Sequence, residues 1–300
     1  MNYDEFKQTI KQTLELRLGA HTSLSIQEIT KNNNTHFDGL TITQENLNIS
    51  PTIYLNDYFS NYQSGVSLDD ICDDILSVYR KNQPKRSIDI SFFTDYNKIK
   101  HRIVFKLINY EKNKALLEKV PHFRYLDLAI VFHCLIDSTE NGSATIQIYT
   151  HHLSYWNVTR DDLYDLAIQN TPRLLPYDLR NMTDVVKELL GASDDMDGLS
   201  WNTDCPYPMY VLTNTHKLHG STCLLYENLL YQFATKLDAD LFILPSSIHE
   251  VLLIPAFSHF SADELNAMVQ EVNSTQLCAD EILSDHVYYF SRKTRLLSIS

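Results

Sequence analysis

Two short apolar runs near the end of the chain constrain its fold more than any other feature. Residues 241–244 and 251–254 are all apolar, and one proline and the mostly polar residues 246–250 separate them. A strand with one exposed face alternates apolar and polar residues, whereas a strand covered on both faces is apolar throughout. The two runs therefore predict neighbouring buried strands joined by a short polar turn.

The segment before these runs predicts a further strand pair and a helix. Residues 210–212 are apolar, residues 214–220 have the composition of a turn, and residues 221–225 suit a returning strand. Between 227 and 237, apolar residues recur at spacings of three and four, which places them on one helical face. The predicted order is a hairpin followed by a helix, as it also is at 126–169 and 241–272.

The rest of the chain supports the same fold class. Helical spacing of apolar residues predicts helices at 3–18, 54–62, 67–79, 160–169, 181–190 and 261–272. β-rich patterns predict strands at 24–29, 40–43, 47–55, 88–93 and 287–290. Residues 104–108 and 110–117 are predicted to be mainly helical, and the prolines within 170–176 are predicted to end the preceding helix. We therefore expect an α+β fold, with mainly antiparallel sheets, helices packed on them and recurring hairpin-then-helix units.

Residues 191–208 have a linker-like mixture of Gly, Ser, Asp and Pro. We expect an N-terminal α+β domain at 1–190, a linker-like loop at 191–208 and a C-terminal α+β domain at 209–300. One continuous unit is the alternative, because Trp201 in the loop favours docking onto the fold.

The charge balance limits the classes of partner. Lys and Arg number 25 and Asp and Glu 38, so the formal net charge is −13. Direct binding to nucleic acid or an anionic membrane uses clustered basic charge and is not expected. No apolar run reaches the roughly 20 residues of a membrane span. An acidic mimic of nucleic acid stays open as an alternative.

Glycine and cysteine limit the chemistry further. None of the 7 glycines lies in a GxGxxG or GxxxxGK[ST] motif, and we expect no cofactor. The 5 cysteines show no CxxC spacing, which is typical of reduced thiols in a cytoplasmic protein.

Several motifs together resemble an uncharacterised bacterial domain-of-unknown-function family over nearly the whole chain. They are NTPRLLP, YVLTN, ILPSSIHEVLLIP, VNSTQ and LSDHVYYF. The helix and strand order, with the DLAIVF and VLLIP runs, is also similar to the YtpQ-like family, which has no established function. The resemblance implies a soluble α+β protein and assigns no catalytic residue.

The polar turn between the two apolar runs is the leading candidate for a ligand or partner site. It contains Ser246, Ser247, His249 and Glu250, which two rigid strands would hold in fixed positions. No GxSxG motif surrounds either serine. The structural alternative is that the serines cap the turn.

Other candidates stand elsewhere in the chain. Arg173 lies between two prolines and could clamp a carboxylate or phosphate, or tie its loop to carbonyl groups of the fold. His216 and His219 form an HxxH pair that could contribute zinc ligands, but no nearby Cys or carboxylate completes a metal motif. Asp127 could be a partly buried carboxylate or a hydrogen-bonding residue at the start of a strand. His133 and Cys134 lie in an apolar run and are expected in the core.

These observations favour a non-enzymatic binding or protein-interaction module whose partner is an unknown protein or small ligand. No coherent catalytic set is present. The chain has 18 tyrosines, and tyrosines suit recognition surfaces where they are exposed. A hydrolase or nucleotide-processing enzyme that uses Arg173, His249 and Glu250 is the second hypothesis. The acidic mimic is the third.

Overall fold

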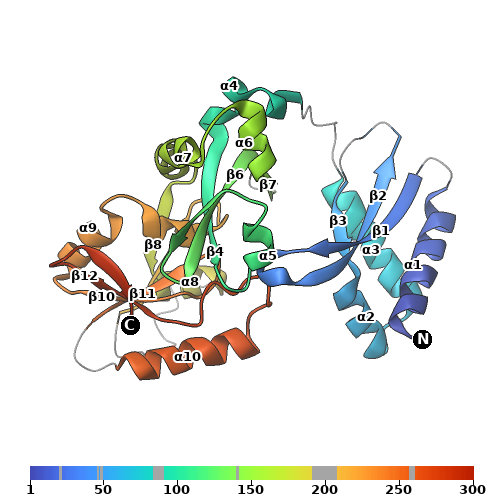
Figure 1. The fold of residues 1–300 in the computed structure, drawn as a ribbon. Coiled ribbons are helices and arrows are strands. Elements are labelled where there is room, and N and C mark those ends of the chain that lie inside the picture. Colours follow the sequence, from blue (N-terminus) through green and yellow to red (C-terminus); the bar gives the residue numbers. More distant parts are fainter. Residues whose placement is uncertain are drawn as a thin grey trace. The chain divides into compact units, whose positions relative to one another are not determined.

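The computed structural model describes residues 1–19, 22–45, 47, 50–83, 91–139, 142–190, 208–256 and 261–300. It divides into two compact units, Met1–Phe92 and Phe93–Ser300 (Figure 1). This division differs from the boundary expected at 191–208, and the reason is strand pairing. Strand β8 (Tyr177–Asn181) pairs with β9 (Tyr210–Asn214), so the segments on both sides of 191–208 share one sheet. Residues 191–207 themselves lie outside the described residues.

The first unit is a three-stranded antiparallel sheet with helices on one face (Figure 1). Its elements are α1 (Tyr3–Leu18), β1 (Thr22–Thr30), η1 (Asn32–Asn34), β2 (His36–Gln44), β3 (Thr52–Tyr54), α2 (Leu55–Gln63) and α3 (Leu68–Asn82). The register pairs Leu24 with Ile42 and Leu40 with Ile53, so these apolar side chains share a face. Together with the apolar sides of the three helices they form the core of this unit.

The second unit begins with a four-stranded antiparallel sheet and its helices. Helix η2 (Ser91–Thr94) spans the division between the units. The elements that follow it are α4 (Tyr96–Ile99), η3 (Lys100–Arg102), β4 (Ile103–Asn109), α5 (Lys114–Leu117), β5 (His122–Tyr125), β6 (Leu128–Thr139), β7 (Gly142–Gln147), α6 (Thr150–Trp156) and α7 (Arg160–Leu174). The long strand β6 pairs with β4, β5 and β7. The hairpin of β6 and β7 followed by helices confirms the order predicted for 126–169.

Two predictions in this region are wrong. The predicted helix at 104–108 is strand β4, whose residues are nearly all buried on both faces, so its sequence lacks the alternation that identifies a strand. Helix α7 continues through Pro172 to Leu174 instead of ending near Gln169. The Asn170 amide donates to the carbonyl oxygens of Lys100 and Ile103 at 2.8 and 3.1 Å, which holds this last part of the helix against the start of β4.

The rest of the second unit forms a six-stranded antiparallel sheet in the order β13-β12-β10-β11-β9-β8. Its further elements are α8 (Met182–Leu189), η4 (Gly220–Leu225), α9 (Leu229–Leu237), β10 (Leu241–Leu244), β11 (Val251–Pro255), α10 (Ala262–Thr275), β12 (Tyr288–Ser291) and β13 (Leu296–Ile299). The two apolar runs are the adjacent inner strands β10 and β11, as predicted. Helix α10 follows them (Figure 1). Its Leu265 and Val269 pack against Leu244 and Ile254.

The hairpin predicted at 210–225 is wrong. Residues 220–225 form the 3-10 helix η4, and β9 pairs instead with β8 and β11. The predicted strand at 88–93 is also wrong where it is described, because residues 91–94 form η2, and residues 88–90 lie outside the described residues. The α+β class itself is confirmed. Among the described helices, none is long and apolar enough to cross a membrane.

Candidate functional site

The turn between β10 and β11 holds the candidates Ser246, Ser247, His249 and Glu250. The Ser247 side chain is almost fully buried, and its Oγ accepts a hydrogen bond of 3.0 Å from the His249 backbone N–H. The Ser247 N–H donates to the Glu250 carbonyl oxygen at 3.1 Å, and the Ser246 N–H donates to that of Leu244 at 2.9 Å. The turn is therefore closed by its own backbone and by the Ser247 hydroxyl, which caps it.

Helix η4 packs against this turn. The Ser221 hydroxyl donates to the Ile248 carbonyl oxygen, and the Thr213 hydroxyl donates to that of His249, both at 2.8 Å. A Cβ atom at Gly220 would overlap the His249 carbonyl oxygen and the Thr213 side chain. Only glycine allows this close approach, so η4 and the turn form one rigid piece of the fold.

Three histidines from separate elements lie in a row beside the turn. The ring centroids of His133, in β6, and His219, before η4, are 5.9 Å apart, and those of His219 and His249 are 5.7 Å apart. The Nδ1 atom of His249 donates to the Lys217 carbonyl oxygen at 3.1 Å. The row brings together two histidines that the sequence singled out, His219 and His249, and one that it placed in the core.

Burial lowers the pKa of two histidines in this row. It lowers the pKa of His133 to about 3, with a smaller contribution from Lys106, and it lowers the pKa of His219 well below its usual value. His133 is 8% exposed, and in the described part of the chain neither of its ring nitrogens has a hydrogen-bond partner. The expected core position of His133 and Cys134 is confirmed. Both imidazoles are neutral near pH 7, and His133 is a core side chain.

His216 does not join the row. Its side chain is exposed, and its Nδ1 lies 3.2 Å from the Thr215 hydroxyl. Across the described ranges, no group of three or more His, Cys, Asp and Glu side chains has a geometry that could hold a metal ion.

Arg173 lies in the last turn of α7. Its guanidinium donates to the His101 carbonyl oxygen at 2.9 Å and to the Asn170 Oδ1 at 3.1 Å. Among the described residues, Arg173 forms no hydrogen bond with His249 or Glu250. These bonds tie the end of the helix to η3, which is the structural role expected as the alternative to ligand binding.

Asp127 lies just before β6 and accepts hydrogen bonds from the hydroxyl groups of two residues that are far from it in the sequence. Its carboxylate oxygens accept hydrogen bonds of 2.6 Å from Ser284 and 2.8 Å from Tyr288. These bonds connect the start of β6 to β12 and to the segment that precedes it. The carboxylate therefore fastens one sheet of the unit to the other.

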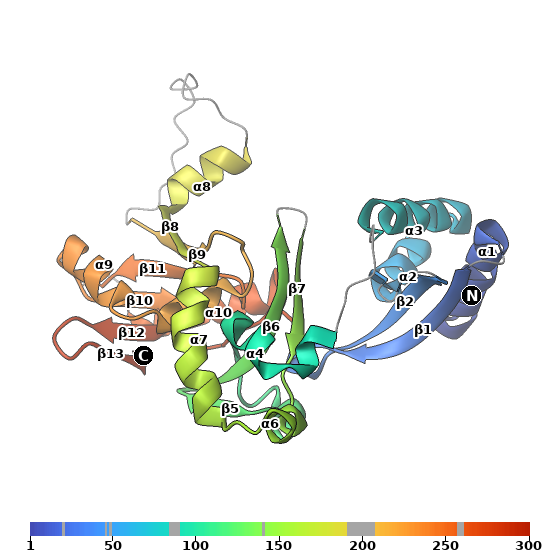
Figure 2. The ribbon, with the colours of Figure 1, turned by 90° about the horizontal axis from the view of Figure 1, so that it is seen from above.

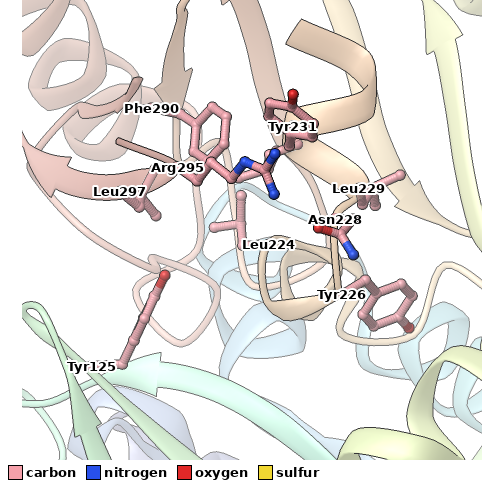
Figure 3. A pocket seen from close by; sticks show the side chains of 10 residues that line it. Tyr125, Leu224, Tyr226, Asn228, Leu229, Tyr231, Phe290, Arg295 and Leu297 are labelled. Carbon is pink, nitrogen blue, oxygen red and sulfur yellow. The ribbon is translucent and has the colours of Figure 1, made fainter. Parts of the chain in front are cut away.

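Three hollows surround the start of α9, and Leu229 lines all of them. The sequence did not indicate these hollows. One, of about 150 Å³, lies between β5, α9 and the β12–β13 hairpin (Figure 3). The second, of about 590 Å³, is lined from α7, β8 and α9, and the third, of about 510 Å³, from β8, β9 and α9. Tyr177 lines both of these larger hollows and is 52% exposed.

Strand β8 is the last strand of the six-stranded sheet, next to β9 (Figure 2). Thr215 donates to the Pro176 carbonyl oxygen and Met182 donates to that of Met209, so the even-numbered residues of this strand bond to β9. Backbone groups alternate between the two sides of an antiparallel strand. Tyr177, Leu179 and Asn181 therefore direct their N–H and C=O groups away from β9, toward the sheet edge that no described strand covers.

Comparison with known proteins gives one match. The model of a family of unknown function (DUF5688) matches residues 3–292. No curated protein and no solved structure matches the chain.

Proposed function

The chain belongs to the family of unknown function DUF5688, and we propose that it is a protein-interaction module in which strand β8 receives an extended segment of a partner protein. The observation that carries this proposal is the edge of β8, which no described strand covers, beside two large hollows. An added strand would bond to the N–H and C=O groups of Tyr177, Leu179 and Asn181.

The side chains next to the edge support binding of a peptide segment. Alternate residues of an added strand would face the side of the sheet on which α9 packs, and these positions are about 7 Å apart. Tyr177 stands between the two hollows, so two such side chains can enter the hollows on either side of its ring. Leu229, Ile168 and Phe233 supply apolar lining, and Arg180, Asp184 and Lys236 supply polar groups at the rim. Apolar pockets with a polar rim are typical of recognition surfaces.

A cytoplasmic location is part of the same proposal. Burial raises the pKa of Cys134 to about 11 and that of Cys223 to about 12, so both thiols stay protonated and unreactive. Cys72, Cys134 and Cys223 are buried and form no disulfide. Free, buried thiols support a reducing compartment.

The first step of the test identifies the partner at the proposed surface. A photo-cross-linking amino acid replaces Tyr177 in the full chain, and in a second protein it replaces Leu296, which is 67% exposed on β13 at the opposite end of the same sheet. A partner that cross-links at 177 and not at 296 is identified by mass spectrometry. The cross-linked segment is then synthesised as a peptide.

The second step measures the affinity of that peptide by fluorescence anisotropy. Leu179→Pro removes the outward N–H group of β8 and leaves the bonds to β9 in place. We expect it to weaken binding about tenfold or more, since it removes a backbone hydrogen bond and crowds the edge. Leu179→Val is the matched control and keeps the N–H group. Equal affinity of the Leu179→Pro and Leu179→Val proteins would refute binding at the β8 edge.

A further inference from the structure

The smallest hollow at the start of α9 differs in character from the two beside β8. Figure 3 shows Arg295 extending into it from the β12–β13 hairpin, with Tyr231 on one side and Leu224 below. Tyr125 enters from β5, and its hydroxyl points toward the hollow. A guanidinium and a phenol hydroxyl thus approach the same space from different sheets.

The guanidinium of Arg295 lies over an aromatic ring. The centre of its guanidinium lies 3.9 Å from the centroid of the Tyr231 ring. A cation on an aromatic face is oriented by that face, and a stacked guanidinium keeps its in-plane N–H donors available. Among the described residues, no carboxylate forms an ion pair with Arg295, whereas Arg292 in the same hairpin pairs with Asp238 and Asp240.

The charge around the hollow favours an anion. None of the residues that line it is acidic, although the chain carries a net charge of −13. Burial raises the pKa of Tyr125, so its hydroxyl stays protonated and can donate a hydrogen bond. Phe290 and Leu297 complete an apolar wall on the remaining side (Figure 3).

We propose that this hollow binds a small oxyanion, either a carboxylate or a phosphate group, between the guanidinium of Arg295 and the hydroxyl of Tyr125. The planar fork of an arginine matches two oxygens of either group, and such charge-assisted pairs are among the strongest hydrogen bonds in proteins. The volume of about 150 Å³ suits a small organic acid or a single phosphate group. This site is independent of the β8 edge and would supply a small-ligand function to the same unit.

The test is a titration of the full-length, ¹⁵N-labelled protein with sodium phosphate and, separately, with sodium benzoate, each at constant ionic strength. The backbone amide of Tyr231 and the side-chain Nε–H of Arg295 serve as reporters, and the latter resonance is assigned by its loss in Arg295→Gln. We expect a saturable shift of both reporters with at least one anion. The anion that saturates at the lower concentration identifies the group as phosphate or carboxylate.

Three variants separate the proposed site from general attraction of anions. Arg295→Gln is expected to weaken binding, followed at the Tyr231 amide, by about tenfold or more. Arg295→Lys keeps the charge but lacks the planar fork, and we expect an intermediate loss. Lys293→Gln removes the same charge from an exposed position in the same hairpin and is expected to change the affinity less than about twofold. The absence of a saturable shift with both anions, or an equal loss in Arg295→Gln and Lys293→Gln, overturns the proposal.

Discussion

His133 gives the chain a specific sensitivity to acid. Burial lowers the pKa of this histidine from 6.5 to about 3, and the described structure provides no partner for either ring nitrogen. The folded state therefore keeps the imidazole neutral over a pH range in which the unfolded chain binds a proton. Since the unfolded state binds more protons there, the free energy of unfolding falls as the pH drops below 6.5 and stops falling near pH 3.

The size of this effect follows from the pKa difference. Each pH unit below the unfolded pKa costs about 1.4 kcal/mol, so His133 alone removes about 2–3 kcal/mol of stability between about pH 7 and about pH 4.5. His133→Leu keeps a similar volume and cannot bind a proton. We expect this variant to be at least as stable as the wild type near pH 7, because it removes two unpartnered polar atoms from the core. Its advantage should grow by about 2–3 kcal/mol at about pH 4.5.

Urea unfolding across this pH range measures the effect. Tryptophan fluorescence reports on the second unit, because both tryptophans, Trp156 and Trp201, lie in its part of the sequence. His101→Leu, which removes an exposed histidine from the same unit, is the matched control. A parallel loss of stability in the wild type and in His133→Leu between about pH 7 and about pH 4.5 would show that His133 is not held neutral by the fold.

Three further substitutions test the contacts around the candidate sites, each by urea unfolding. Gly220→Ala should lower stability by about 1–3 kcal/mol because its Cβ meets the His249 carbonyl oxygen, and an unchanged midpoint would contradict this packing. Asp127→Asn should cost about 1.5–3 kcal/mol, since a charged acceptor of two hydroxyl groups is lost, and a neutral effect would contradict its role. Thr171→Val should cost about 1–3 kcal/mol because it leaves the buried Phe105 N–H unpaired, and a stability gain would refute that bond.

The sequence predicts those helices and strands that are determined by residues close together in the chain. The runs 241–244 and 251–254 are strands because nearly every residue is apolar, and α10 begins where the capping box of Ser261 and Glu264 places it. Strand β4 is equally apolar, but its lack of alternation also suits a buried helix, and its strand state is fixed by pairing with β6. Residues 221–225 look like a strand and form η4, because Gly220 must fit beneath a turn that comes almost 30 residues later.

The candidate sites depend even more on distant contacts. In the sequence YDLRN of β8 the alternation of apolar and polar residues covers only Tyr177 to Arg180, which is too short to predict a strand. Its only described partner strand begins at Tyr210, on the other side of 191–208. The histidine row joins residues from three elements, and only the fold shows that His133 lies beside His219. Arg295 carries no local motif at all. It becomes a candidate binding residue because its guanidinium lies over the ring of Tyr231, which is more than 60 residues earlier in the chain.

The most direct test of the central claim is hydrogen exchange in β8, measured by NMR with and without the partner peptide. In the free protein, the amide hydrogens of Asp178 and Arg180 face β9 and should exchange slowly, whereas those of Leu179 and Asn181 face the open edge and should exchange fast. The account predicts that the peptide slows exchange at Leu179 and Asn181 as it binds. Saturating peptide that leaves exchange at both amides unchanged would contradict strand addition at β8.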